Sequence, residues 1–239
     1  MIFKHFLKKY LFQEGKLFYK ILKEVRLKND AHKLKKYGHH LLRALFDAAL
    51  ENNIPVWLEF GTLLGAYREK SFIKHDFDID CGMYANDYSL AFEDNLLSKG
   101  FIKIRSFYMK DLKTNSEILT EVTFDYYGLL VDVFLYRIDG EERYSYGYRN
   151  YDDLSSSMKT YKVIMFYYPK IKGFSTLPID DHFYPVPANT VEMLKCYYGD
   201  EYMMPIKNYV TSLEDKKHKS LNYTEHRGYL KGFRSIADR

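Results

Sequence analysis

Residues 56–83 read VWLEFGTLLGAYREKSFIKHDFDIDCGM, and this stretch sets the fold expected for the chain. Residues 56–58 predict a short buried strand, and a helical pattern opens at the pair Gly61-Thr62. Residues 78–83 predict a second strand. A strand, a turn, a helix N-terminus and another strand are typical of a mixed α/β sheet domain.

Three carboxylates, Asp76, Asp78 and Asp80, stand at alternate positions where the chain enters the second strand. Side chains of a strand alternate between its two faces, so all three are expected on one face. Like charges gathered there repel, and a bound cation offsets that repulsion. Oxygen ligands of this kind favour Mg²⁺ or Mn²⁺. A solvated acidic turn is the alternative, which the apolar residues between the carboxylates weaken.

A fourth carboxylate, Asp132, lies in the apolar run LLVDVFL over residues 129–135. An acidic side chain is almost never buried in a strand without a partner. Two interpretations follow: either Asp132 binds a structural arginine, or it faces the cation together with Asp78 and Asp80 from the adjacent strand.

Positively charged and glycine residues near this cluster suit an anionic ligand. Gly61 and Thr62, at a helix start, offer backbone N–H groups and a hydroxyl to a phosphate. Arg68 and Lys74, between the glycine and the carboxylates, can neutralise further phosphate charge.

The chain is expected to divide into a basic head over residues 1–36, a catalytic domain over 37–210 and a polar tail over 211–239. The tail is expected either to dock on the domain or to be loose. Expected helices cover 38–52, 85–98 and 190–198; expected strands cover 101–109, 117–126, 129–136 and 162–168. Tyr127-Gly128 separates two of these strands as in a hairpin. Within 141–185 only the strand at 162–168 is clear.

The composition excludes several classes of protein. The chain has 239 residues and 28.6 kDa, with 46% hydrophobic and 28% charged residues, which is far from a disordered chain. Two cysteines, Cys81 and Cys196, argue against a disulfide framework or a structural zinc site and favour a reducing compartment. No apolar run is long enough to span a membrane, and the start lacks a secretory signal.

The net charge of +4 hides an asymmetry along the chain. Residues 1–36 hold 11 basic and 3 acidic side chains, whereas the rest holds 25 and 29. Residues 2–25 predict a basic amphipathic helix, which either packs on the body or rests on an anionic membrane through residues 1–26. Nucleic-acid binding is not expected, because the head lacks interleaved aromatic residues on a sheet and the body is acidic.

Residues 60–68 and 72–83 closely resemble the signature of the LicD/fukutin family of phosphotransferases, approximately GTLLGAxR, a short spacer and FIPWDDDIDIGM. Residues 131–134 (VDVF) are similar to the family's VDIF strand. Residues 187–205, with YYGD at 197–200, are similar to its closing helix and YGDxxxxP segment. Together these matches cover about residues 55–205.

The sequence also departs from this signature. Lys74-His75 stands where the family often has Pro-Trp, and Phe77 stands where it often has the middle Asp. The remaining DxDxD form is similar to the fukutin-like branch, although it does not name the substrate.

The resemblance implies a nucleotidyltransferase-like fold, a mixed β-sheet flanked by helices, here with an N-terminal amphipathic helical segment. It also implies an activity. Family members transfer phosphocholine or a polyol phosphate, such as ribitol or glycerol phosphate, from a CDP-activated donor to a hydroxyl of a cell-surface glycan, and CMP is released. Biosynthesis of capsule or lipopolysaccharide is the expected setting.

The resemblance further implies roles for single residues. Asp78, Asp80 and Asp132 would be catalytic and would hold Mg²⁺ or Mn²⁺, with Asp76 as an additional or outer ligand, and Asp132 would accept the proton of the attacking hydroxyl. The implied substrate-binding residues are Gly61, Thr62, Arg68, Lys74, His75 and Glu59, of which Glu59 is expected to point at the site or at Arg68. For a choline substrate, Trp57 and Tyr67 are candidates for an aromatic cage, although Trp57 suits the core better.

Two alternatives to this function stay open. One is a nucleotidyltransferase that moves a nucleoside monophosphate from a triphosphate to a small molecule, sugar or protein. The other is a non-catalytic binding protein, which the full carboxylate set disfavours. The expected partners are the CDP-activated donor and a glycan acceptor, lipid-linked or free, and the expected location is cytoplasmic, at the inner face of a membrane if the head binds it.

Overall fold

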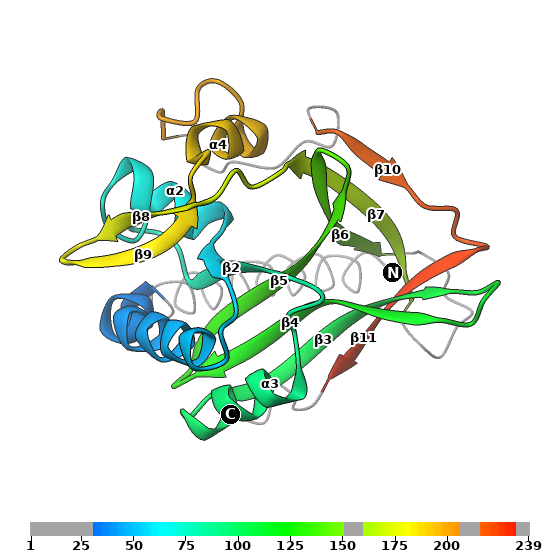
Figure 1. The fold of residues 1–239 in the computed structure, drawn as a ribbon, viewed down its shortest axis with the longest axis horizontal. Coiled ribbons are helices and arrows are strands. Elements are labelled where there is room, and N and C mark those ends of the chain that lie inside the picture. The colour runs from blue at the N-terminus through cyan, green and yellow to red at the C-terminus, as the bar shows by residue number, and fades with distance from the viewer. Residues whose placement is uncertain (1–30, 151–159, 206–215, 233–239) are drawn as a thin grey trace, which may run out of the picture.

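The computed structural model describes residues 31–150, 160–205 and 216–232 (Figure 1). The predicted amphipathic segment at 2–25 and the membrane contact over 1–26 lie outside these residues. A helix covers 31–51. The other elements are β1 (Val56–Leu58), α2 (Phe60–Arg68), β2 (Asp78–Tyr84), α3 (Leu90–Ser98), β3 (Ile102–Asp111), β4 (Glu117–Tyr126), β5 (Leu129–Asp139), β6 (Glu142–Asn150), β7 (Thr160–Pro169), β8 (Phe174–Ile179), β9 (His182–Pro187), α4 (Thr190–Tyr198), β10 (His218–Ser220) and β11 (His226–Gly232).

In the part of the chain that the structure describes, nine strands form one sheet, and six of them close into a ring. Neighbouring pairs run β5, β4, β3, β11, β7 and β6, and β6 pairs with β5 again, so the path is a barrel-like ring. β2 extends the sheet by pairing in parallel with β5, and β1 pairs antiparallel with β2. β8 and β9 make a separate two-stranded sheet. The predicted mixed α/β sheet is therefore confirmed.

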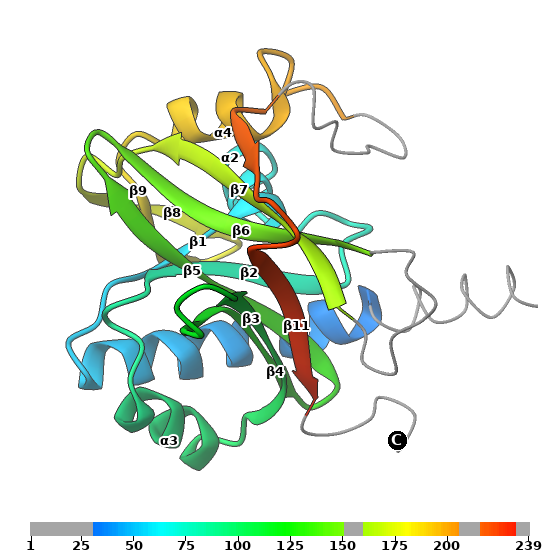
Figure 2. The same ribbon diagram turned by 90° about the vertical axis from the view of Figure 1, so that its right-hand side faces the viewer.

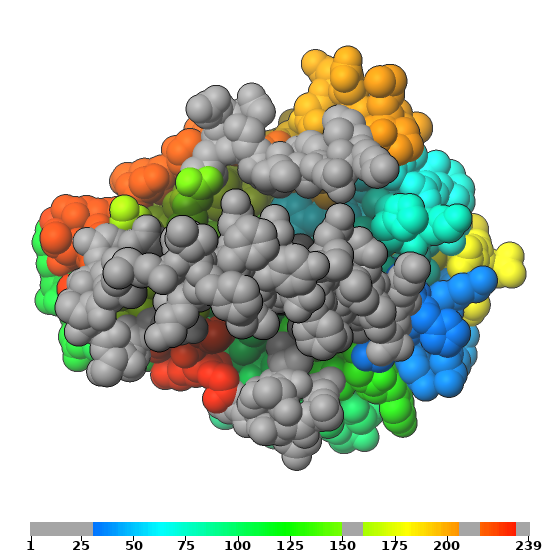
Figure 3. Space-filling view, turned by 180° about the vertical axis from the view of Figure 1, so that it is seen from behind, coloured from blue at the N-terminus to red at the C-terminus, as the bar shows by residue number. Residues whose placement is uncertain are grey.

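The helices lie on two sides of this sheet (Figure 2). The helix over 31–51 and α3 lie side by side, where Glu51 accepts hydrogen bonds from Asn95 and Lys99, both at 2.8 Å. α2, α4 and the β8–β9 hairpin lie on the other side. Seen from behind, Figure 3 shows α4, α2 and the helix over 31–51 along one side of the molecule and β10 and β11 along the other.

One apolar core joins these layers. It contains fully buried side chains of the helix over 31–51, of β1, of β2 and of β5, including Leu41, Leu45, Trp57, Ile79 and Val133. Removing such side chains from water is the main favourable term in folding. Among the described residues, no helix is long and apolar enough to cross a membrane. Cys81 and Cys196 are both free thiols.

Several predicted elements are found with shifted ends. The first helix already covers residue 31, earlier than the predicted 38. α3 begins at Leu90 and not at residue 85, because the Ser89 hydroxyl accepts the Phe92 N–H at 3.2 Å and caps the helix there. The hairpin between β4 and β5 is confirmed. Tyr127 and Gly128 have φ values of 52° and 84°, the left-handed pair that a tight two-residue turn requires.

Within 141–185 the sequence interpretation identified only the strand at 162–168, whereas the structure has β6, β7, β8 and the start of β9 there. Glycine, serine and proline mark this segment as loop by local rules. The structure shows why glycine suits a strand here: a Cβ on Gly147 would lie 2.6 Å from the Phe166 ring. The glycine leaves room for that ring, which local rules do not anticipate.

The polar segment expected to be a tail also contributes strands. β10 pairs with β7, and β11 lies between β3 and β7 in the ring. On β11, a Cβ on Gly228 would lie 2.3 Å from the Tyr148 ring, so only glycine leaves room for this aromatic side chain.

Candidate active site

Parallel pairing of β2 with β5 sets two of the predicted carboxylates next to each other. Asp80 is the register partner of Asp132, Asp132 is the partner of Thr123 on β4, and Thr123 is the partner of Arg105 on β3. Register partners point to the same side of a sheet. We call these four residues, together with Asp78 two positions before Asp80, the carboxylate row.

Burial and then the charges of neighbouring carboxylates make ionisation of this cluster unfavourable. Burial, followed by the charges of Asp78, Asp132 and Asp76, raises the pKa of Asp80 well above its usual range. Burial, and then Asp132 and Asp76, raise the pKa of Asp78 to about 7, while Arg105 opposes the shift. Burial and Glu69 raise the pKa of Asp76 to about 6. Clustered carboxylates of this kind favour a proton or a cation between them.

The N-terminus of α2 faces this cluster. A Cβ on Gly61 would lie 3.1 Å from Asp76 Oδ2 and 3.6 Å from Asp80 Oδ2, so the glycine backbone approaches both carboxylates. The Gly61 N–H donates to the Asp80 carboxylate, and the Thr62 hydroxyl accepts the Asp80 N–H at 2.9 Å. The preceding Phe60 has a φ of 38°, a backbone region that phenylalanine rarely adopts. Gly61 thus lies at the site, whereas the Thr62 hydroxyl positions β2.

The predicted basic residues lie at the outer edge of the cluster. Arg68 Nη2 donates to Glu69 at 2.7 Å and Nη1 to the Tyr202 carbonyl at 3.4 Å. Both Arg68 and His75 lower the pKa of Asp76, which places their charges near it. Lys74 and His75 are exposed.

Glu59 is a correction to the sequence interpretation, because it points neither at the site nor at Arg68. Its carboxylate is fully buried and accepts hydrogen bonds from Trp57 Nε1 at 2.7 Å, from Arg143 Nη1 at 2.9 Å and from the Tyr197 hydroxyl. Trp57 is likewise fully buried, as expected of a core residue, so it is not available for an aromatic cage.

For Asp132 the structure shows both of the proposed environments. Its Oδ1 accepts the Thr123 hydroxyl and lies 3.5 Å from Arg105 Nη2, while Arg105 Nε donates to Thr123 Oγ1 at 2.9 Å. At the same time Asp132 is next to Asp80 in register. It therefore has an arginine partner and still faces the other carboxylates.

Sequence reasoning missed three residues of this site: Arg105, Thr123 and Glu121. Glu121 and Thr123 are two positions apart on β4 and so share a face. Burial, and then the charge of Asp132, raise the pKa of Glu121 to about 8, and Arg105 opposes the shift. The sequence did hold a signal for these two residues: Glu121 and Thr123 flank a valine in a predicted strand, and alternation puts both polar side chains on one face.

The donor chemistry of the cluster suits a hard divalent cation. Its groups are carboxylate oxygens, and burial, followed by the charges of neighbouring carboxylates, raises the pKa values of Asp78 and Asp80. Among the described residues, no set of three His, Cys, Asp or Glu side chains stands ready to hold a metal ion. The residue types fit Mg²⁺ or Mn²⁺, and these carboxylates would have to move closer together around it.

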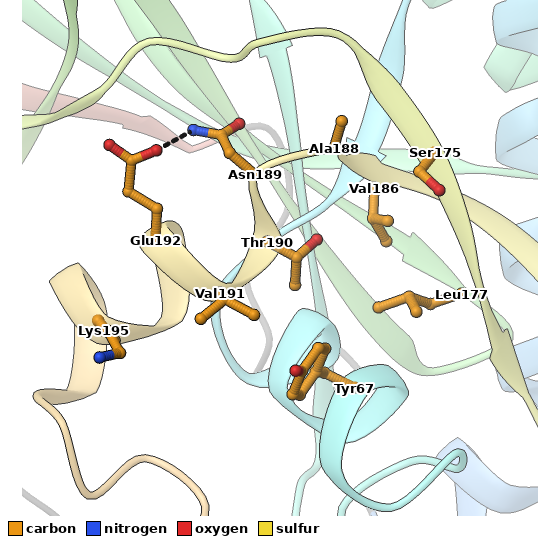
Figure 4. Close-up of a pocket in the computed structure, with 10 residues that line it drawn as sticks. All are labelled: Tyr67, Ser175, Leu177, Val186, Ala188, Asn189, Thr190, Val191, Glu192 and Lys195. Carbon is orange, nitrogen blue, oxygen red and sulfur yellow. Dashed lines mark hydrogen bonds between the residues drawn. The ribbon is translucent and has the colours of Figure 1, made fainter.

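A separate pocket of about 610 Å³ lies between α2, the β8–β9 hairpin and the start of α4 (Figure 4). Tyr67, Leu177, Val186 and Val191 give it an apolar lining, and none of the clustered carboxylates takes part. At its rim Asn189 donates to Glu192 at 2.9 Å. Tyr67, a candidate for the aromatic cage, thus lines this separate pocket.

Comparisons with known proteins agree with the sequence motifs. A family model described as LicD/FKTN/FKRP, nucleotidyltransferase domain, matches residues 53–189. The proteins named ribitol-5-phosphate transferase FKTN from Homo sapiens and from Mus musculus are each 24% identical over 186 residues, 75% of this chain and 36% of the relative. An uncharacterized protein of Caenorhabditis elegans is 31% identical over 162 residues, 66% of this chain and 40% of the relative. The chain thus spans well under half the length of these relatives.

Proposed function

Because the chain belongs to the LicD/FKTN/FKRP family, we propose that it transfers a phosphorylated alcohol from a CDP-activated donor to a hydroxyl of a glycan, with release of CMP. The observation that carries the proposal is the parallel register of β2 and β5, which puts Asp80 beside Asp132, under the N-terminus of α2. Ribitol phosphate is the first candidate for the transferred group, because relatives carry the name ribitol-5-phosphate transferase. Phosphocholine and glycerol phosphate are the next.

We propose for each residue the role that the family resemblance implies and that its position supports. Asp78, Asp80 and Asp132 would hold Mg²⁺ or Mn²⁺, with Asp76 as an outer ligand. A bound divalent cation supplies charge neutralisation on the donor diphosphate and on the departing CMP. The N-terminal turn of α2 at Gly61, with its positive dipole end, suits the donor phosphates.

The protein's own groups also orient and activate the acceptor. Asp132 is held by Thr123 and Arg105 through Oδ1. Its second oxygen is the atom we propose to accept the proton of the attacking glycan hydroxyl. Arg68 lies near Asp76, and the exposed Lys74 and His75 precede it in the sequence, so we propose these three residues as contacts for the donor phosphates. Positioning and electrostatics of this kind supply most of the rate in phosphoryl transfer.

A panel of donors tests the activity. The purified protein is incubated with a glycan acceptor and CDP-ribitol, CDP-glycerol, CDP-choline or a nucleoside triphosphate, with Mg²⁺ or Mn²⁺. Release of CMP supports the proposal. Release of pyrophosphate from a triphosphate instead supports the second candidate, a nucleotidyltransferase, an activity whose name also appears in the description of the matching family model.

Asp80→Asn tests the site within that assay. Loss of a proposed metal ligand, the carboxylate that accepts the Gly61 N–H at the start of α2, should lower the rate about a thousandfold. Asp94→Asn is the matched control, because Asp94 is exposed on α3, away from the carboxylate row. An Asp80→Asn variant that folds and retains its activity would contradict the site assignment.

Membrane contact and location remain predictions from the sequence. The basic segment at 1–26 is proposed to bind an anionic membrane and so to bring the domain to a lipid-linked acceptor, at the inner face of the membrane. Co-sedimentation with anionic liposomes, with and without residues 1–26, tests this: equal binding would refute the contact.

A further inference from the structure

Negative charge outnumbers positive charge around the carboxylate row. Five acidic side chains lie in this region: Asp76, Asp78, Asp80, Glu121 and Asp132. Arg105 acts on three of them, because it contacts Asp132 and opposes the shifts of Asp78 and Glu121. Arg105 is therefore the central positive charge of the row.

The contacts of Arg105 are those of a guanidinium that can change partners. Only Nη2 approaches Asp132, at 3.5 Å, and the two-bond fork that makes arginine–carboxylate pairs strong is not formed. The side chain of Arg105 keeps 31% of its surface exposed. Nε is anchored to Thr123 Oγ1 at 2.9 Å, and the guanidinium carbon lies 5.9 Å from the centre of the Phe107 ring. The base of the group is thus fixed while its end is loosely held.

We propose that Arg105 is an exchangeable counter-ion that holds Asp132 in the metal-free protein and binds the diphosphate of the donor once a divalent cation has taken Asp132. This inference rests on the proposed function. A cation between Asp80 and Asp132 would remove the attraction that draws Nη2 to Asp132. The freed guanidinium would then present its planar fork beside the bound cation, and this fork matches phosphate oxygens.

The inference makes two predictions of opposite sign for one substitution. In Arg105→Gln, Mn²⁺ alone should bind about threefold tighter than in the unchanged protein, because a competitor for Asp132 is gone. CDP in the presence of saturating Mn²⁺ should bind about tenfold weaker, because a charge-assisted hydrogen bond to phosphate is lost. Isothermal titration calorimetry with MnCl₂, and then with CDP, measures both.

Arg227→Gln is the control for the loss of one positive charge. Arg227 is exposed on β11, the strand next to β3, and its register partner is Lys110. It should leave both affinities unchanged. Arg105→Lys is a second variant that keeps the charge without the fork: Mn²⁺ affinity should match that of the unchanged protein, and CDP affinity should fall about threefold.

The outcomes separate this inference from the function on which it rests. If the unchanged protein binds Mn²⁺ and CDP, but Arg105→Gln weakens both or changes neither, the counter-ion role is wrong and the proposed function stands. If the unchanged protein binds no Mn²⁺, the metal-dependent function itself fails, and the inference fails with it. Tighter Mn²⁺ together with weaker CDP supports the inference.

Discussion

Two arginine–carboxylate pairs in this protein differ in how completely their partners are satisfied. Glu59 and Arg143 are both fully buried, and Arg143 Nη1 lies 2.9 Å from Glu59 while its guanidinium carbon stacks 3.9 Å from the centre of the Tyr136 ring. Arg105 and Asp132 keep 31% and 14% of their side-chain surface exposed and meet through one 3.5 Å contact. The first pair is sealed from solvent, although Arg143 Nε has no hydrogen-bond partner among the described residues, and the second pair is partly exposed.

This difference separates a structural network from a binding site. Around Glu59, each charge has its opposite and further hydrogen bonds from Trp57 and Tyr197. In the carboxylate row, by contrast, the acidic groups exceed their partners, and burial raises the pKa of Asp78 to about 7. Charged residues that lack enough opposite charges in the folded protein are candidates for binding a ligand.

The largest expected effect comes from breaking the buried Glu59–Arg143 pair. Glu59→Gln leaves the Arg143 guanidinium buried without a counter-charge and should lower the free energy of unfolding by about 3–5 kcal/mol. Asp78→Asn, in the carboxylate row, should leave that free energy unchanged or raise it, because it relieves repulsion. Urea denaturation at pH 7 without divalent cations measures both variants. Equal losses in the two would show that the regions do not differ as described.

The second effect is a dependence of stability on pH. The folded-state pKa values of Asp76 and Asp78, about 6 and about 7, lie above the usual value of 3.8, so the folded state binds protons that the unfolded state has released. Their contribution to stability is complete below pH 4 and is lost as pH rises through 6 and 7. Between pH 5 and pH 8 the free energy of unfolding should fall by about 2–4 kcal/mol.

Two checks locate this pH dependence in the carboxylate row. Asp78→Asn should make the fall smaller, because one of the titrating groups is gone. Added Mg²⁺ should also reduce it, because a bound cation stabilises the charged carboxylates. A fall of the same size in all three conditions would place its origin elsewhere in the molecule.

The smallest expected effects are those of an alanine substitution at Gly82 or at Gly61. In Gly82→Ala the new Cβ would lie 2.4 Å from Trp57 Nε1 in the buried network around Glu59, which should cost about 1–3 kcal/mol of stability. In Gly61→Ala the Cβ would meet Asp76 Oδ2 at 3.1 Å, so Mn²⁺ affinity should fall while stability changes by less than about 1 kcal/mol. Thermal denaturation and Mn²⁺ titration of both variants give the comparison, which reversed results would contradict.

Local sequence patterns predicted the elements that build the site. The helix start near Gly61, the strand that carries Asp78 and Asp80, and the hairpin at Tyr127-Gly128 are all found. These features depend on alternation, capping and turn residues, which act over a few positions. That Asp132 faces Asp78 and Asp80 from the adjacent strand was one of two interpretations left open, and the pairing of β2 with β5 confirms the adjacency.

What sequence reasoning missed depends on contacts between distant positions. Glu59 finds Arg143 84 positions away, on a strand that local rules did not identify. Arg105 and Glu121 lie on strands that were predicted, but β3 and β4 pair with register shifts between Lys103 and Arg105 and between Phe107 and Tyr108. The shifts decide which side chains of β3 stand opposite β4, and no local pattern fixes them.

The ring of strands carries a consequence for how the protein is made. β11 supplies the pairing that links β3 to β7, and it is the last of the six ring strands to leave the ribosome. Until residues 226–232 have been synthesised, β3 exposes an edge over residues 105–111, and β7 exposes its end at residues 160–161, because β10 pairs only with residues 164–166 of β7. Unpaired edges of this kind recruit other chains. A ribosome that stalls before β11 has been synthesised would therefore hold a nascent chain with unpaired strand edges. Chaperones are expected to matter most at this stage.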